Sequence, residues 1–278
     1  MKCNYHTHST YCDGKDPFFR FVEEAVRQHF DQLGFSSHAP VSFENDFGIK
    51  EEKIPDYIAE IQQLKVQYPE LQLFTALECD FIPGITRPFS DFQKQYHLDY
   101  IIGGVHLVKP QDSSQLWFID GSKIETYDNG LADLFHHDIK KAVSAFWEQT
   151  FEMIETQHFD IIAHLDKIKM HNQKRFFTES EDWYLRLVDH SLELIKQKAL
   201  IVEINSRGIY KKRCPDFYPS DYILQKISKL KIPMVISSDA HQSEELSMCY
   251  EATIQKLRSF GIYQLMYLKQ GKWEEYSI

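Results

Sequence analysis

The chain has 278 residues, of which 43% are hydrophobic and 26% are charged. This length and composition are typical of a folded protein with a sizeable buried core, and they exclude a disordered or fibrous chain. The formal net charge is -10 at pH 7 and no long basic run occurs, so we expect no polyanion-binding surface and no nucleic-acid partner.

Targeting signals and cysteine usage predict a cytoplasmic protein. No basic N-terminal segment precedes an apolar run, and no apolar stretch approaches about 18 residues, so we expect neither secretion nor a membrane partner. The cysteines are odd in number, widely spaced and without a C-x-x-C pair, and they are Cys3, Cys12, Cys79, Cys214 and Cys249. We expect them to be reduced thiols. The sequence leaves the oligomeric state open.

Short apolar runs alternate with amphipathic patterns along the chain. The runs that predict strands are, in order, 33–37, 71–77, 100–105, 161–163, 200–204 and 234–237. The patterns that predict helices are 18–28, 53–67, 139–156, 181–197, 220–229 and 244–259. This alternation favours an α/β fold with a parallel sheet and crossover helices.

We interpret the chain as one domain over residues 1–278, because no linker or repeat divides it. An open doubly wound sheet and a barrel both satisfy the alternation, and about seven or eight strand-helix repeats favour the barrel. Residues 109–138 show no clear period. We expect them to form a long loop beside the functional site.

The first chemical signal is His6-Thr7-His8, at the end of an opening strand. Side chains two residues apart on a strand face the same side and can share one metal ion. The motif is weak evidence by itself, since 13 histidines in 278 residues would give some His-x-His pair at roughly even odds.

Further candidate ligands follow the other predicted strands, which strengthens the signal. They are His38, Glu78 with Asp80, His106, His164, and Asp239 with His241. The carboxyl ends of parallel strands share one edge, so these groups are expected to converge on one site. Imidazoles and carboxylates suit zinc, iron or manganese, and more than four ligands imply more than one metal ion.

The remaining histidines are expected to be solvated or locally hydrogen-bonded, because they lie in predicted helices or loops. They are His29, His97, His136, His137, His158, His171 and His190.

Two nearby features have an ordinary and a functional interpretation. Asp13-Gly14 is a turn signal, or it brings a carboxylate to the same metals, and the residues alone favour the turn. Arg207 follows the predicted strand 200–204. It is a phosphate clamp or a surface arginine paired with an acidic neighbour, with about equal weight.

Taken together, these motifs resemble the polymerase and histidinol phosphatase (PHP) superfamily, and within it the branch of histidinol-phosphate phosphatases. The resemblance covers nearly the whole chain. The motifs that carry it are His6-Thr-His8 with Asp13-Gly14, Ser37-His38-Ala-Pro40, Leu77-Glu78-Cys-Asp80, Gly104-Val-His106, Ala163-His164-Leu-Asp166 and Ser238-Asp239-Ala-His241. It implies a distorted (β/α)7 barrel, similar to a TIM barrel, with three divalent metal ions.

The resemblance also implies a ligand set, in which Asp13 is a ligand after all. One metal is held by His6, His8, Glu78 and Asp239. Glu78 bridges to a second metal with His106 and His164, and Asp13, His38 and His241 hold the third.

The activity implied is hydrolysis of a small phosphate monoester, L-histidinol phosphate, in histidine biosynthesis. A hydroxide bridging two metals would attack phosphorus while Arg207 balances charge on the phosphoryl oxygens. Asp166 is expected to orient a ligand, contact substrate or cap a helix. The alternatives are another phosphoesterase of the same superfamily, acting on nucleotides, oligonucleotides or phosphotyrosine, and a non-catalytic metal-binding module.

Overall fold

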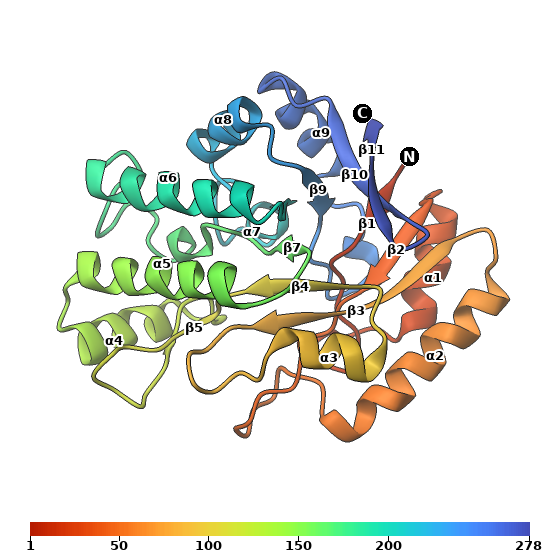
Figure 1. Ribbon diagram of the computed structural model, residues 1–278, viewed down its shortest axis with the longest axis horizontal. Helices are drawn as coiled ribbons and strands as arrows, with labels where there is room; N and C mark the ends of the chain where they lie inside the picture. Colours follow the sequence, from red (N-terminus) through yellow and green to blue (C-terminus); the bar gives the residue numbers. More distant parts are fainter.

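Seven short strands lie parallel in one sheet, in a computed structural model that describes residues 1–278 (Figure 1). Their spatial order follows the chain. The strands are β1 (Cys3–Asn4), β2 (Gln32–Phe35), β3 (Gln72–Asp80), β4 (Tyr100–Gly104), β7 (Ile161–Ile162), β8 (Ile201–Asn205) and β9 (Met234–Ser237). The predicted strands are all present, with ends shifted by at most three residues.

The first and last strands of the sheet come together just beyond their carboxyl ends. Thr7 and Ala240 form an isolated parallel bridge. The His8 N–H donates to the Ala240 carbonyl at 2.8 Å, and the Ala240 N–H donates to the His6 carbonyl at 3.3 Å. These bonds nearly close the sheet, so the predicted distorted (β/α)7 barrel is confirmed and the open doubly wound sheet is excluded.

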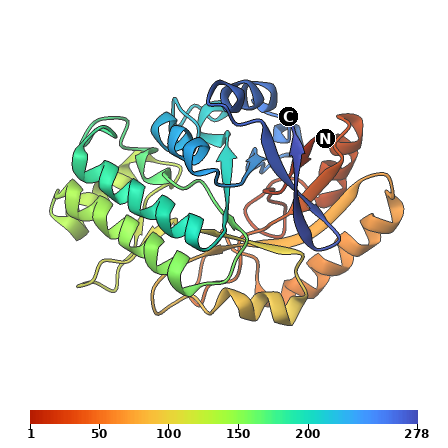
Figure 2. The same ribbon diagram turned by 45° about the horizontal axis from the view of Figure 1, so that its top comes forward.

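Helices surround the sheet and cover its outer face (Figures 1 and 2). They are α1 (Phe18–Arg27), α2 (Ile54–Gln67), α3 (Phe89–Tyr96), α4 (Ile124–Phe135), α5 (Ile139–Thr156), α6 (Asp182–Gln197), α7 (Arg207–Tyr210), α8 (Asp221–Leu230) and α9 (Tyr250–Ser259). Short 3-10 turns are η1 (Glu51–Lys53), η2 (Lys167–Lys169) and η3 (Ser243–Glu245). No helix is both long and apolar enough to cross a membrane.

The helix predicted at 244–259 begins only at Tyr250. The preceding residues turn inward instead, because the Glu245 carboxylate accepts the His241 N–H at 2.8 Å. Cys249 then adopts a left-handed backbone with φ of 63°. A local tertiary contact therefore overrides the helical pattern over the first part of this segment.

The prediction of one long loop at 109–138 was wrong. A small antiparallel pair, β5 (Leu107–Val108) and β6 (Trp117–Phe118), leads into helix α4. Gly130 lies inside this helix, and a Cβ at this position would come within 2.1 Å of Trp117. The glycine makes room for a buried tryptophan.

A hairpin that the sequence analysis missed covers the amino ends of the barrel strands (Figure 2). It consists of β10 (Gln264–Lys269) and β11 (Lys272–Ser277). Its two turn residues both have positive φ, 50° at Gln270 and 74° at Gly271, which suits the tight turn of a two-residue hairpin. Leu268 donates its N–H to the Tyr5 hydroxyl at 3.0 Å.

Candidate metal centre

The predicted ligands meet at the carboxyl ends of the strands. His6 and His8 follow β1, His38 follows β2, Glu78 lies in β3, and His106, His164, Asp239 and His241 follow β4, β7 and β9. Parallel strands bring their ends to one edge of the barrel, and this geometry gathers groups that are far apart in sequence. The convergence predicted from the sequence is present.

Glu78 is the central side chain of the cluster and is 1% exposed. Its Oε2 lies 3.1 Å from His6 Nε2 and 3.1 Å from His38 Nδ1. Its Oε1 lies 3.0 Å from His164 Nε2 and 3.4 Å from His106 Nε2. Burial would raise the pKa of this carboxyl, but the surrounding imidazoles hold its pKa well below the usual value. Glu78 is therefore an ionised carboxylate between two groups of histidines.

Three groups of ligand atoms lie close enough together to hold a metal ion, with all atoms of a group within 4.8 Å of one another. The groups are His8, Asp13, His38 and His241; His6, His8 and Asp239; and His38, Glu78 and His106. His164 belongs to none of these groups but lies 3.1 Å from His106 through the Nε2 atoms. His8 and His38 each belong to two groups, which the family-based assignment did not anticipate.

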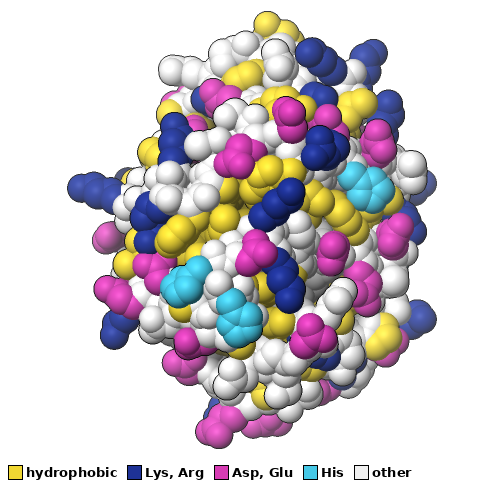
Figure 3. All heavy atoms as spheres, turned by 90° about the vertical axis from the view of Figure 1, so that its left-hand side faces the viewer, with side chains coloured by type: hydrophobic (Ala, Val, Ile, Leu, Met, Phe, Trp, Pro, Cys, Tyr) yellow, Lys and Arg dark blue, Asp and Glu magenta, His cyan; other side chains and the backbone are white.

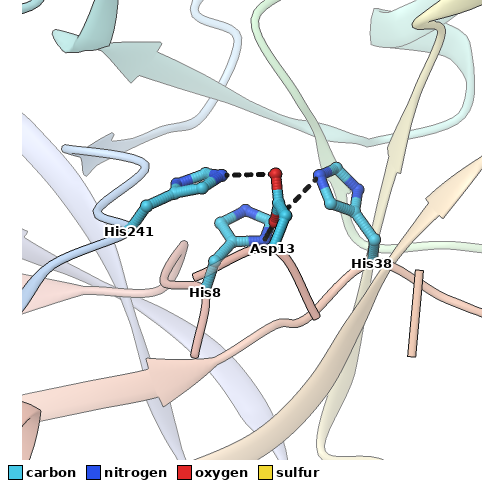
Figure 4. A group of neighbouring side chains, drawn as sticks. All are labelled: His8, Asp13, His38 and His241. Atoms are coloured by element: carbon cyan, nitrogen blue, oxygen red, sulfur yellow. Dashed lines mark hydrogen bonds and ion pairs between the residues drawn. The ribbon is translucent and has the colours of Figure 1, made fainter. Parts of the chain in front are cut away.

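The first group is drawn in Figure 4, with the Asp13 carboxylate between His241 and His38. The Nε2 of His241 lies 3.2 Å from Asp13 Oδ2, and His8 Nδ1 lies 3.7 Å from Oδ1. Gly14 is required for this arrangement, since a Cβ there would come within 2.4 Å of the His8 carbonyl. Asp13-Gly14 therefore forms a turn that also places the Asp13 carboxylate beside the histidines, and its role as a metal ligand stays a prediction.

Several of the candidate ligand atoms are placed to bind a cation and do not form hydrogen bonds with one another. His6 Nε2, His8 Nε2, His38 Nδ1 and Glu78 Oε2 are all buried, yet none has a hydrogen-bond partner. Buried polar atoms in proteins nearly always have partners, so several unpaired ones directed at a common space are suited to bind a cation. Imidazole and carboxylate donors suit zinc, manganese or iron.

The charge states of the histidines depend on their neighbours. Burial and the imidazoles of His241 and His38 hold the pKa of His8 well below its usual value, which keeps it neutral. Burial also acts to lower the pKa of His6, but Glu78 and Glu203 outweigh it and hold that pKa well above its usual value. A metal ion that binds His6 must therefore displace this proton.

A cavity of about 280 Å³ opens onto the cluster. Basic side chains contribute much of its wall, and they are Lys15, Lys167, Arg207, Lys211 and Arg213. Three apolar side chains, Phe47, Leu107 and Phe118, also line it. The cavity therefore combines a cationic wall with an apolar one beside the candidate ligands.

Arg207 lines this cavity, as its position after β8 predicts. Its Nη1 donates to the Asp239 carbonyl at 2.6 Å and lies 3.5 Å from Glu245 Oε2. Burial acts to lower the pKa of Arg207, but Asp239, Tyr210 and Glu245 raise it above the usual value. The guanidinium pairs with an acidic neighbour and also lines the cavity, and its role as a phosphate clamp stays a prediction.

Lys167 and Asp120 form a buried ion pair that the sequence analysis missed, with Nζ and Oδ2 2.8 Å apart. Asp120 Oδ2 is also 3.9 Å from His106 Nε2. Burial would raise the pKa of Asp120, but Lys167 and His106 lower it to about 2. Burial would lower the pKa of His106, but Asp120 and Glu78 raise it to about 9. The available signal was a lysine three residues after His164.

Asp166 does not orient a metal-site histidine. Its Oδ2 accepts the Ser220 N–H at 2.9 Å and pairs with Lys169 Nζ at 2.9 Å. Of the three alternatives for Asp166, these contacts favour the role at a helix N-terminus, because Ser220 is the N-cap of α8. The histidines expected to lie outside the site do lie outside all three ligand groups. His171 is the buried one, and its Nε2 bonds to the Gly121 carbonyl at 2.8 Å.

The fold and the site together define an α/β barrel with a candidate polynuclear metal centre at the carboxyl ends of its strands. The chain belongs to the PHP domain family, whose model matches residues 4–207.

Individual relatives span almost the full chain. It is 28% identical over 284 aligned residues to the histidinol-phosphatase of Bacillus subtilis, covering 92% of this chain and 99% of that one. The HisK crystal structure from Listeria monocytogenes superposes with a TM-score of 0.79 at 22% identity, covering 90% of this chain and 99% of the other. A histidinol phosphate phosphatase from Lactococcus lactis, complexed with Zn, L-histidinol and phosphate, gives a TM-score of 0.68 at 17% identity, covering 98% of each chain. These similarities to solved structures support the barrel fold.

Proposed function

We propose that the protein is a metal-dependent histidinol-phosphatase, which hydrolyses L-histidinol phosphate to L-histidinol and phosphate. The observation that carries the proposal is the set of unpaired, buried imidazole and carboxylate atoms at the base of a cavity with basic walls. The substrate is suggested by the Bacillus subtilis relative, named a histidinol-phosphatase, and by the Lactococcus lactis protein complexed with Zn, L-histidinol and phosphate.

We assign three divalent ions, zinc, manganese or iron, to the ligand groups. His6, His8 and Asp239 would hold one with Glu78, which would bridge to a second beside His106 and His164. Asp13, His38 and His241 would hold the third, with His8 also within reach. Such ions, when bound, would supply positive charge for the phosphoryl oxygens and lower the pKa of water.

The chain's own cations complement the phosphoryl group. Lys167 Nζ lies 4.0 Å from the candidate ligand Asp239, so it can reach an oxygen of a phosphate placed over the ligands. Arg207 lines the same cavity, with Nη1 held by the Asp239 carbonyl at 2.6 Å. Fixed cations near a transferring phosphoryl group stabilise the charge that develops there. We therefore assign phosphate binding to both side chains.

The apolar wall fits the organic part of the substrate. Phe47 and Phe118 lie with ring centroids 6.4 Å apart, and both line the cavity. An aromatic surface beside a cationic one suits a phosphate ester that carries a flat ring. Asp120 also lines the cavity, and we assign it to the amine of the substrate because its Oδ1 has no hydrogen-bond partner.

The protein surface gives no support to a polyanion partner on the face that carries α4 to α6. Figure 3 shows acidic and basic side chains interspersed there, without a continuous basic patch. A small phosphate monoester therefore remains the proposed substrate class. All five cysteines are free, which supports our assignment of the enzyme to the cytoplasm.

The test is phosphate release by protein reconstituted with zinc or manganese. L-Histidinol phosphate is compared with nucleotides, sugar phosphates and phosphotyrosine under identical conditions. We expect a kcat/KM above roughly 10⁴ M⁻¹s⁻¹ for histidinol phosphate alone. Equal and feeble rates across the panel would reject the substrate assignment, and a preference for phosphotyrosine or a nucleotide would identify a different phosphoesterase.

A further inference from the structure

Glu203 is a completely buried carboxylate beneath the ligand cluster, with 0% of its surface exposed. It lies in the middle of β8. Side chains two residues apart on a strand face the same side. Ile201 therefore joins the apolar layer near the amino end of β8, while Asn205 lies on the side of the metal centre. A buried charge in this position requires partners.

Two partners of Glu203 are candidate ligands, and the third is Asn205 on the same strand. Its Oε2 lies 2.8 Å from His6 Nδ1. Its Oε1 accepts the His164 backbone N–H at 2.7 Å and the Asn205 side-chain amide at 2.9 Å. The same amide lies 3.2 Å from Asp239 Oδ2. One carboxylate thus connects three ligand positions, directly or through Asn205.

We propose that Glu203 is a positioning residue, which fixes the His6 ring so that Nε2 presents its lone pair to the metal centre. An ionised carboxylate only accepts hydrogen bonds, so His6 Nδ1 must donate to it. Nε2 then faces Glu78 Oε2 at 3.1 Å and Asp239 Oδ1 at 3.9 Å. Outer carboxylates that accept from a ligating imidazole fix its orientation and strengthen metal binding. The inference rests on the metal centre of the proposed function.

Asp166 provides a matched comparison inside the same barrel. It is also a carboxylate with 0% exposure, but it bonds to Ser220 and Lys169 and contacts no candidate ligand. If Glu203 had a purely structural role, substitution of either residue would have a similar effect on metal affinity. A positioning role makes metal affinity sensitive to Glu203 only.

The test compares Glu203→Gln with Asp166→Asn. Glutamine can donate from its amide to His6 Nδ1, which favours the tautomer with hydrogen on Nε2, directed at the metal. We expect zinc affinity for at least one ion to fall about 10- to 100-fold in Glu203→Gln, measured by competition with a chromophoric chelator. Asp166→Asn is expected to stay within about threefold of the unmodified protein, whatever its thermal midpoint.

A second measurement uses the unmodified protein and so does not depend on the folding of a variant. In zinc-loaded protein with ¹⁵N-labelled histidine, the His6 signal is expected to show a protonated Nδ1 and a metal-bound Nε2. A reversed pattern, or Glu203→Gln with unchanged zinc affinity, overturns the inference alone. Unmodified protein that binds no zinc overturns the proposed function as well, so the two failures are distinguishable.

Discussion

The two ends of the barrel are built from the same strands but have opposite chemistry. At the amino ends, Tyr5 packs against Tyr100 and Trp273, with ring centroids 5.8 and 5.1 Å away. At the carboxyl ends, Glu78 is surrounded by imidazoles. On β3, Ala76 lies in the apolar layer and Glu78 lies in the polar layer two residues later. One end is suited to stability and the other to chemistry.

We expect the largest effect from a substitution of Glu78, at the centre of the polar end. Glu78→Gln keeps the shape of the side chain and removes the charge that two groups of histidines share. We expect kcat/KM to fall by about 10³-fold or more, because metal ions supply several kcal/mol of stabilisation to the transition state. Metal content measured by mass spectrometry should fall in parallel. Full activity with fewer bound ions would contradict the central place of Glu78.

Lys167 tests the cationic wall. Lys167→Met removes the charge at similar length, and we expect kcat/KM to fall about 100-fold, since a hydrogen bond to a charged group contributes roughly 1.5–3 kcal/mol. Inhibition by inorganic phosphate should weaken while zinc content is retained. Lys167→Arg serves as the control, with partial recovery expected. Unchanged phosphate inhibition in Lys167→Met would remove this residue from the phosphate site.

The apolar end should respond in stability alone. Leu268 is 1% exposed in the hairpin over the amino ends of the strands. Leu268→Ala should lower the free energy of unfolding by about 2–4 kcal/mol through the lost apolar contacts and the cavity left behind. Urea denaturation measures this change. We expect kcat/KM per folded molecule to stay within about twofold, and a large loss would show that the two ends are coupled.

We expect the smallest effect from a substitution of Phe47, which tests whether the apolar wall contacts the ring of the substrate. Phe47→Ala removes one ring from the cavity, and the lost apolar contact is expected to raise KM for L-histidinol phosphate about tenfold. Ethyl phosphate, which has no ring, is the control substrate, and its kcat/KM should change little. An equal loss for both substrates would assign Phe47 to the general shape of the site and not to the ring.

Most of the candidate ligands could be predicted from sequence because they lie at or just after the carboxyl end of a buried parallel strand, whereas Asp13 lies in a turn and was implied only by the family resemblance. His38, His106 and His164 needed only the positions of their strands to be placed at one edge. Lys167 and Glu203 could not be placed in the same way. The spacing of Lys167, three residues after His164, does not by itself indicate an inward-facing lysine, and the inward direction of Glu203 appears only once the register of β8 is known.

Two errors in the fold prediction have a similar physical cause. Residues 109–138 were expected to form a loop, but they include a helix in which Gly130 leaves room for Trp117 to pack against α4. The helix expected from residue 244 starts later because Glu245 pairs with Lys211 and accepts from His241. In both segments, contacts with residues outside the segment's own helix override the local pattern.

The most direct test of the metal centre is a crystal of the zinc-loaded protein, with anomalous diffraction recorded on both sides of the zinc edge. Our assignment predicts three peaks enclosed by the ligand groups around Glu78, with His6 bound through Nε2. A map with no peak inside the barrel mouth, or with peaks only at surface histidines such as His136, would contradict the metal centre.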